Sequence, residues 1–393
     1  MLPSARDLQD RLVVAGDEHI NQVVALLDRM EVRGAADALL DPLRGRLAQL
    51  APVRPLTLSR LLFQPLDPVI EPSLGWQPGA AAVPRNALAP IGAAILGRIG
   101  PCAAVVRKMI QGRDWSDGAA VAAAGSVLWP AASEVLGTLA VPSGWTAAGL
   151  PLTRFEAVRV DIAAVLHHAE LLHHWPAELD RPELPSLVAG TLASTQARHP
   201  GGLAVVLAVL LANAGVAACV LAAAATLQGM APEAAVEHAL SRTEQDLAVS
   251  MPSSALPAAC TQAMRAATLL DAVDGPGAQP RFRVLAQQAR RKAEEACRGR
   301  VLQAVDHQLL PALAAADTLD DAATASLEAA TRDIRRLSMV GQRLGSAPVY
   351  AMLLNRTAAG ILAATAPALS RMDRLRLAEL LVGADAALRL APG

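Results

Sequence analysis

Apolar residues recur along most of the chain at the three- and four-residue spacing of an amphipathic helix. No stretch shows the strict alternation that is typical of a half-buried strand, and no repeat of fixed period is present. The pattern predicts an all-α protein, a multi-helical array or a set of stacked helical bundles resembling an α-superhelix. The clearest stripe lies within residues 153–175 and consists of Phe155, Val158, Ile162, Val165, Ala169 and Leu172.

Residues 201–230 are the most apolar part of the chain, with no charged side chain between Arg198 and Glu233. A run of more than about 18 apolar residues is typical of a membrane-spanning helix. Asn213 and Gly215 fall in its middle, however, and predict a helix end that would leave two helices too short to span. We favour a buried helical hairpin over residues 201–230. Membrane association through residues 203–227 is the alternative.

Prolines and glycines suggest how the chain is divided. Prolines interrupt residues 52–90 so often that a long helix is excluded there, and a Gly- and Pro-containing linker covers residues 274–277. The sequence therefore predicts four parts. They are an N-terminal helical hairpin (1–51), a long Pro-rich ordered connector (52–90), a central helical domain (91–273) and a C-terminal helical bundle (279–393).

The Pro-rich connector is too apolar to be disordered, so we expect it to be held against the helices. Asp67 precedes Pro68 and is expected to occupy a turn. The predicted structural anchor consists of Leu61, Leu62, Phe63, Leu66 and Asp67.

Two short segments carry a resemblance to a known family. Residues 60–68 read RLLFQPLDP and residues 85–91 read RNALAPI. Together they resemble a stretch found in uncharacterised helical proteins of proteobacteria. The resemblance covers about residues 55–90 and implies no activity.

Composition narrows the function classes. The chain is 53% hydrophobic but only 2% aromatic, so its core is expected to form by close packing of Ala-, Leu- and Val-rich helices. The formal net charge of -1 argues against a nucleic-acid partner. The basic residues are nearly all Arg, as in proteins from GC-rich bacterial genomes. The first residues lack the apolar segment of a secretory signal, which predicts a cytoplasmic protein.

Histidines gather near the end of the stripe at residues 153–175. On one helix, His167, Glu170 and His174 would share a face, and Glu170 with His173 matches the Glu-x-x-His element of carboxylate-bridged metal sites. The alternative is a solvated polar face, because no second Glu-x-x-His and no HExxH motif is present. The candidate ligands of a transition metal are His167, Glu170, His173 and His174.

A second cluster is basic and lies in residues 281–300. Its Arg and Glu residues alternate at i, i+4 spacing, which is typical of an exposed helix, and only Phe282 could stack on a nucleobase. We therefore interpret the cluster as a solvated face or a protein-binding helix. The candidate interaction residues are Arg283, Arg290, Arg291, Lys292 and Arg298.

Catalysis has little local support, because the chain lacks Gly-x-Ser-x-Gly, Walker A and Gly-x-Gly-x-x-Gly motifs. The cysteines form no CxxC pair. The sequence favours a non-catalytic helical scaffold or protein-interaction protein whose partner is another protein. A helical metal-binding protein or metalloenzyme and a membrane-associated protein are the alternatives.

Overall fold

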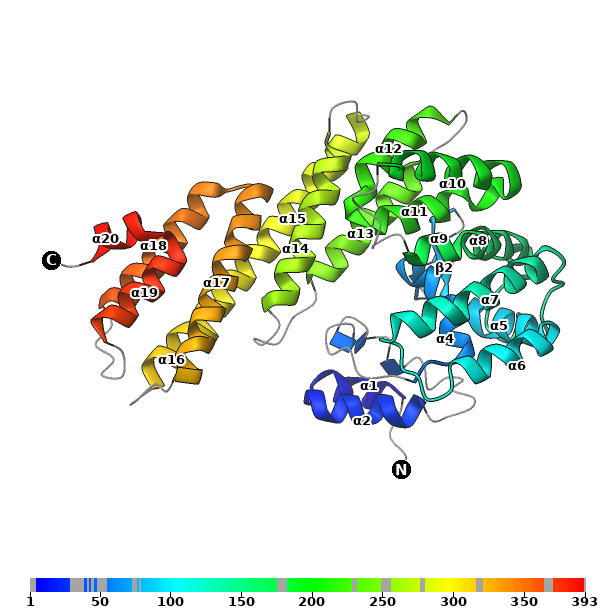
Figure 1. The fold of residues 1–393 in the computed structure, drawn as a ribbon, viewed down its shortest axis with the longest axis horizontal. Helices are drawn as coiled ribbons and strands as arrows, with labels where there is room; N and C mark the ends of the chain where they lie inside the picture. Colours follow the sequence, from blue (N-terminus) through cyan, green and yellow to red (C-terminus); the bar gives the residue numbers. More distant parts are fainter. Residues whose placement is uncertain are drawn as a thin grey trace. The chain divides into compact units, whose positions relative to one another are not determined.

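The computed structural model describes residues 5–28, 39–40, 42–43, 46–47, 55–72, 76–77, 79–174, 182–227, 232–248, 256–275, 280–315, 321–363 and 370–391. Helices account for nearly all regular structure in these residues, so the predicted all-α, multi-helical fold is confirmed (Figure 1). Contacts divide the chain into two compact units, Met1–Ala239 (unit 1) and Leu240–Gly393 (unit 2).

Unit 1 consists of short and medium helices joined by turns. They are α1 (Ala5–Val13), α2 (Asp17–Asp28), α4 (Leu58–Phe63), η2 (Gln64–Val69, a 3-10 helix), α5 (Arg85–Arg98), α6 (Gly100–Met109), α7 (Gly118–Gly137), η3 (Leu152–Arg154), α8 (Phe155–His167), α9 (Ala169–His174), α10 (Leu184–Arg198), η5 (Pro200–Gly202), α11 (Leu203–Ala212), η6 (Ala214–Val216), α12 (Ala217–Thr226) and the first part of α13 (Glu233–Ala248).

The Pro-rich segment lies in the middle of unit 1. Thr57 caps α4 by accepting a hydrogen bond from the Arg60 N–H, and the prolines that follow turn the chain into η2. Helices α7, α8, α9 and α11 contact α4 or η2. The segment is therefore part of the core.

Proline creates a hydrogen-bonding problem in this buried segment. In an α-helix the Leu61 carbonyl would accept the N–H of residue 65, but Pro65 has none. The buried Trp129 of α7 supplies the donor, because its Nε1 lies 2.8 Å from the Leu61 oxygen. This bond fixes which face of α7 is turned inward.

A second distant donor serves the end of the same segment. Strands β1 (Ile70–Glu71) and β2 (Val83–Pro84) form a two-residue parallel pair. Beside it, the buried His238 of α13 donates from Nε2 to the Pro68 carbonyl at 3.1 Å, and its Nδ1 lies 3.0 Å from Glu71 Oε1. Side chains far away in the sequence thus donate hydrogen bonds to the Leu61 and Pro68 carbonyls of the Pro-rich segment. One of them, His238, also contacts the Glu71 carboxylate where the segment ends.

The N-terminal residues build a small cluster around α1 and α2. Arg46 Nε donates to Asp17 Oδ1 at 2.9 Å beside this cluster. Much of the second helix predicted for the N-terminal hairpin lies outside the described residues. The buried members of the cluster are Leu12, Ile20, Val24, Leu27, Leu40, Leu43 and Leu47.

The central apolar run ends its first helix at Asn213, as the sequence predicted. Helices α11 and α12 contain 10 residues each, so each is about 15 Å long, half the hydrocarbon thickness of a bilayer. Residues 205–211 of α11 are all buried, and the two helices pack on each other and on α10. Membrane association through residues 203–227 stays a prediction.

Unit 2 consists of longer helices that pack side by side. They are the last part of α13, α14 (Leu256–Val273), α15 (Pro280–Ala304), η8 (Val305–Leu309, a π-helix), α16 (Leu310–Ala315), α17 (Asp321–Leu344), α18 (Ala347–Ala363), α19 (Arg371–Val382) and α20 (Ala384–Leu390). Helix α17 contacts α14, α15, α18 and α19 and is the central element. A glycine lets one of these helices approach closely: Tyr350 of α18 lies directly over Gly341 of α17 and donates to the Glu294 carbonyl at 3.0 Å.

Several helices end where the periodicity alone did not predict an end. The stripe at residues 153–175 is divided at His168, and within the predicted C-terminal bundle Gly383, which has φ +90°, separates α19 from α20. The four-part division stays a prediction, but contacts group the residues differently. Helix α14, which precedes the linker at 274–277, packs on α15 and α17 within unit 2.

The Trp129 bond can be tested by Trp129→Phe, which keeps an aromatic ring but removes the donor to the Leu61 carbonyl. We expect the free energy of unfolding of unit 1 to fall by about 2–4 kcal/mol, because the buried Leu61 carbonyl loses its donor and the smaller ring leaves a cavity. Thermal and urea unfolding measure the loss. Trp115→Phe is the matched control, since Trp115 is only partly buried and should cost less than about 1 kcal/mol. Equal losses for the two variants would contradict the assignment.

Candidate functional site

The histidines that the sequence grouped as metal ligands lie on both sides of the break between α8 and α9. Helix α8 ends at His167, whose ring meets those of His168 and His199, with centroids 4.7 and 5.7 Å away. His173 instead lies against Trp129, with centroids 5.5 Å apart, and Glu170 is exposed. The side chain of His174 lies outside the described residues.

Within the described ranges, no group of three His, Cys, Asp or Glu side chains is arranged to hold a metal ion. The cluster of His167, His168 and His199 was not predicted, because His199 follows α10 and approaches only through the packing of the helices. A metal site at His167, Glu170, His173 and His174 stays a prediction, which the metal content of untagged protein would test.

The hydrogen bonds of the cluster define a tautomer. Thr195 donates its one hydroxyl proton to the Thr191 carbonyl at 2.8 Å, so it can only accept from His168 Nε2, which lies 2.9 Å away. His168 therefore carries a proton on Nε2. A second proton would have to bind at Nδ1.

Desolvation keeps these rings neutral near pH 7. Burial, reinforced by His167, His199 and Arg198, lowers the pKa of His168 to about 4. Burial and Arg198 also lower the pKa of His167, and burial with His167, Arg198 and Arg159 lowers that of His199. The cluster is thus an uncharged polar contact between α8 and the end of α10.

Asp161 is a carboxyl group two turns before His168 on α8. Burial raises its pKa to about 8, so it is largely protonated at neutral pH. Gly202 of η5 packs against α8 at this position, since a Cβ there would overlap Ala164 and touch the Val160 carbonyl at 3.0 Å. The close approach of η5 to α8 desolvates this part of the helix.

The predicted basic residues of α15 have different environments. Arg283 and Arg291 are exposed, whereas Lys292 lies 2.7 Å from Glu244 and Arg298 lies 3.7 Å from Glu294. Arg290 is largely buried; it donates to Asp271 Oδ1 at 2.9 Å and to the Arg343 carbonyl at 3.4 Å. Three of the five candidates are therefore engaged in ion pairs within unit 2.

The predicted structural anchor lies within the core of unit 1, apart from its acidic member. Leu61, Leu62 and Leu66 are completely buried, and Phe63 is nearly so. Asp67 is exposed on η2.

Asp271 of α14, which pairs with Arg290 of α15, lies at one surface of unit 2. It also accepts from Arg343 of α17, at 2.8 Å from Nε, and Arg343 reaches Met264 Sδ at 3.5 Å. Met339 lies one turn before Arg343, and Arg336 lies one turn before Met339. Met264 is 46% exposed and Met339 59% exposed. We call Met264, Arg336, Met339 and Arg343 the methionine surface.

The two methionines lie at similar heights on adjacent helices. Cys260 of α14 contacts the Asp333 carbonyl of α17 at 3.4 Å, and Asp271 contacts Arg343 further along both helices. Helices α14 and α17 therefore run in the same direction. Arg343 contacts Met264 and lies one turn after Met339 on α17, so both methionines lie on the Arg343 side of the pair. Sequence periodicity could have marked each methionine as exposed but could not have paired them.

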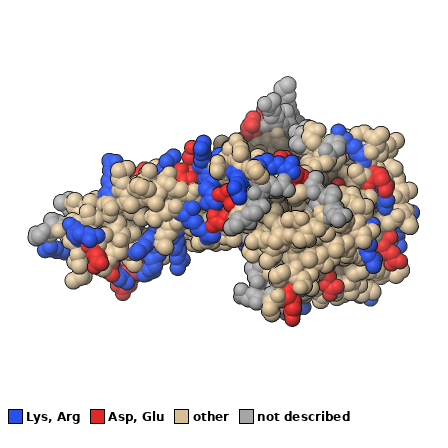
Figure 2. Space-filling view, turned by 90° about the horizontal axis from the view of Figure 1, so that it is seen from above, with Lys and Arg blue, Asp and Glu red and all other residues tan. Residues whose placement is uncertain are grey.

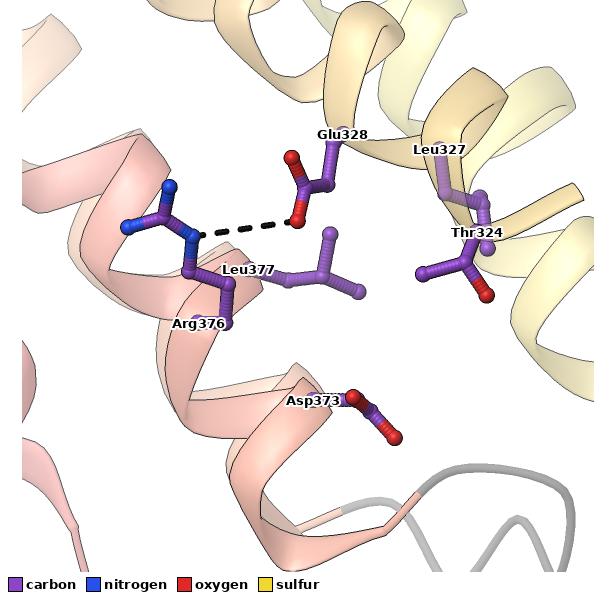
Figure 3. A pocket seen from close by; sticks show the side chains of 6 residues that line it. All are labelled: Thr324, Leu327, Glu328, Asp373, Arg376 and Leu377. Atoms are coloured by element: carbon purple, nitrogen blue, oxygen red, sulfur yellow. Dashed lines mark ion pairs between the residues drawn. The ribbon is translucent and has the colours of Figure 1, made fainter. Parts of the chain in front are cut away.

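A small pocket lies between α17 and α19 (Figure 3). It has room for about one water molecule, and Glu328 faces Arg376 across it with Oε1 3.7 Å from Nε. This space is far below the several hundred Å³ that a substrate requires. Its lining residues are Thr324, Leu327, Glu328, Asp373, Arg376 and Leu377.

Comparisons of the chain with family models, with curated proteins and with solved structures found no match. The resemblance noted for residues 55–90 stays an expectation.

The pKa of Asp161 is raised and the pKa of His168 is lowered, so the two groups should affect the free energy of unfolding in opposite ways as the pH changes. The Asp161 pKa is raised above its unfolded value of 3.8, so its contribution to stability falls as the pH rises from about 4 to 8. The His168 pKa is lowered below its unfolded value of 6.5, so its contribution falls as the pH drops from about 6.5 to 4. Each slope is at most about 1.4 kcal/mol per pH unit.

Asp161→Asn should therefore stabilise the protein relative to wild type, and by more at pH 8 than at pH 4. His168→Gln should gain stability relative to wild type as the pH is lowered from 6.5 to 4. Urea unfolding at a series of pH values measures both differences. Differences that do not change with pH would contradict the burial of these two groups.

The role of Arg290 can be separated from that of a surface arginine. Arg290→Ala should destabilise unit 2 by about 1–2 kcal/mol, because Asp271 and the Arg343 carbonyl lose a charged donor. Arg291→Ala, an exposed neighbour on the same helix, should stay within about 0.5 kcal/mol of wild type. Thermal unfolding compares them, and an equal shift in both would mean that the Arg290 contacts do not hold the helices together.

Proposed function

We propose that this protein is a non-catalytic helical interaction protein and that it binds another protein through the methionine surface of unit 2. The supporting observation is the pair of exposed methionines, Met264 and Met339, aligned beside Arg336 and Arg343 on adjacent helices. Soluble proteins scatter exposed apolar side chains singly, and an apolar pair next to arginines is typical of a recognition surface.

The chemistry of the side chains suits binding to a protein. Methionine is unbranched and polarisable, so it can adapt to an apolar partner surface. Arginine is enriched among residues that dominate interface energies. Arg343 is held by Asp271 through Nε at 2.8 Å and Nη2 at 2.6 Å, so less side-chain entropy is lost when it binds.

The same features suggest the form of the partner. Arg336, with a side chain that is 71% exposed, and Arg343 lie on either side of Met339 along α17. A helix with an apolar face flanked by Asp or Glu would complement this arrangement in shape and charge. The four side chains would form the centre of an interface, since a stable complex buries about 800 Å² on each partner.

The proposal predicts a partner that depends on the two methionines. Full-length protein expressed in its own cells should capture one stoichiometric partner, and Met264→Ser with Met339→Ser should weaken that binding by about tenfold or more. Met352→Ser with Met372→Ser is the matched control, because both methionines are exposed on other helices of unit 2. Affinity measured with the purified pair gives the comparison.

Two outcomes would contradict the proposal. One is equal binding by the test and control variants, which would place the interface elsewhere. The other is steady turnover of a small molecule by the purified protein, which would make it an enzyme. Thermal unfolding of each variant shows that lost binding does not reflect lost folding.

A further inference from the structure

One exposed methionine of unit 2 contacts a charged hydrogen-bond donor. Met264 of α14 is exposed, and its sulfur lies 3.5 Å from Nη1 of Arg343 on α17. A thioether sulfur is only a weak acceptor. The guanidinium therefore gains little from this contact as long as Met264 keeps its ordinary thioether side chain.

A different residue sets the position of Arg343. Its Nε and Nη2 both contact Asp271 Oδ2, at 2.8 and 2.6 Å. These contacts occupy one edge of the planar guanidinium and leave Nη1 for Met264. Asp271 also accepts from Arg290 of α15, so the carboxylate that holds the guanidinium is itself held. The donor is thus in place before any chemical change at Met264.

Other exposed methionines lack such a donor. Met109, Met339, Met352 and Met372 are also exposed, so a small oxidant in solution can reach all five sulfurs. Among the methionines within the described ranges, Met264 is the one whose sulfur is hydrogen-bonded to a cation. The product of oxidation meets a charged donor at this sulfur and not at the other four.

Oxidation converts the weak acceptor into a strong one. A sulfur lone pair attacks one oxygen of a peroxide, so an S–O bond forms while the O–O bond breaks. The other oxygen takes up the proton and leaves as water, or as an alcohol from an organic peroxide. The sulfur is oxidised by two electrons, which reduce the peroxide. The product, methionine sulfoxide, is polar, and sulfoxide reductases reverse the reaction.

We propose that Met264 is a reversible oxidation site and that its sulfoxide oxygen accepts a hydrogen bond from Arg343 Nη1. This charge-assisted bond replaces the weak contact with sulfur, so unit 2 stays folded when Met264 is oxidised. The same change makes an apolar member of the methionine surface polar and engages Arg343. The surface therefore loses affinity for an apolar partner under oxidising conditions, a step that rests on the function proposed above.

Peroxide treatment of the full-length protein tests the site without a partner. Met339→Leu leaves Met264 as the oxidisable side chain of the methionine surface. Hydrogen peroxide is added until peptide mass spectrometry finds Met264 converted to sulfoxide, and the unfolding temperature is compared before and after treatment. Adding Arg343→Ala should enlarge the fall on oxidation by about 2–4 °C, because the sulfoxide then has no charged donor.

A matched pair of controls accounts for the other oxidisable side chains. Met264→Leu with Met339→Leu removes the site, and the same protein with Arg343→Ala removes the donor as well. Oxidation should change the unfolding temperatures of these two controls equally. Each protein is compared with its own untreated form, so the stability that Arg343→Ala loses at Asp271 cancels.

Two results would overturn the oxidation site. One is a Met264 that remains a thioether while Met352 and Met372 are converted. The other is an equal fall in unfolding temperature with and without Arg343, which would mean that the guanidinium does not hold the sulfoxide oxygen.

Partner binding tests the regulatory step separately. Oxidised Met339→Leu protein, freed of peroxide, should bind the captured partner about tenfold more weakly or less, and sulfoxide reductase should restore binding. The variant with both methionines replaced by Leu should bind equally before and after treatment. Unchanged binding by oxidised Met339→Leu would overturn the regulation and leave the proposed function standing. If no methionine-dependent partner is found, the proposed function and its regulation both fail, while the unfolding temperatures still decide the oxidation site.

Discussion

The hydrogen bond from the Trp129 indole to the Leu61 carbonyl is the interaction on which the arrangement of unit 1 depends. Pro65 removes the local donor, so the buried segment can be satisfied only if α7 places its indole there. His238 serves the Pro68 carbonyl in the same way. With so few aromatic residues in the chain, one tryptophan both fills the core and orients α7.

Unit 2 depends on an ionic contact instead. Asp271 accepts from Arg290 of α15 and Arg343 of α17, so one carboxylate joins three helices. Gly341 allows α17 and α18 to pack closely, because the Tyr350 ring occupies the space that a Cβ at position 341 would fill. The same Asp271 contact orients Arg343 toward Met264. Stability and the proposed binding surface are therefore linked through a single side chain.

Uncharged polar groups characterise the contact of α8 with α10 and η5. Burial raises the pKa of Asp161 and lowers the pKa of His168, and in both cases it favours the neutral form of the side chain. On the surface, Figure 2 shows charged side chains in scattered groups separated by uncharged residues. Residues 199–232, which begin at this contact, contain no Asp, Glu, Lys or Arg.

The sequence by itself determined the helical class, the end of the helix at Asn213 and the apolar character of Leu61, Leu62 and Phe63, because periodicity, capping and burial preference are local properties. Only the tertiary structure brought His167 to His199 and Arg290 to Asp271, and only it placed Met264 beside α17. Such contacts join residues from different helices, and their geometry depends on the packing of whole helices, which no local pattern of residues encodes.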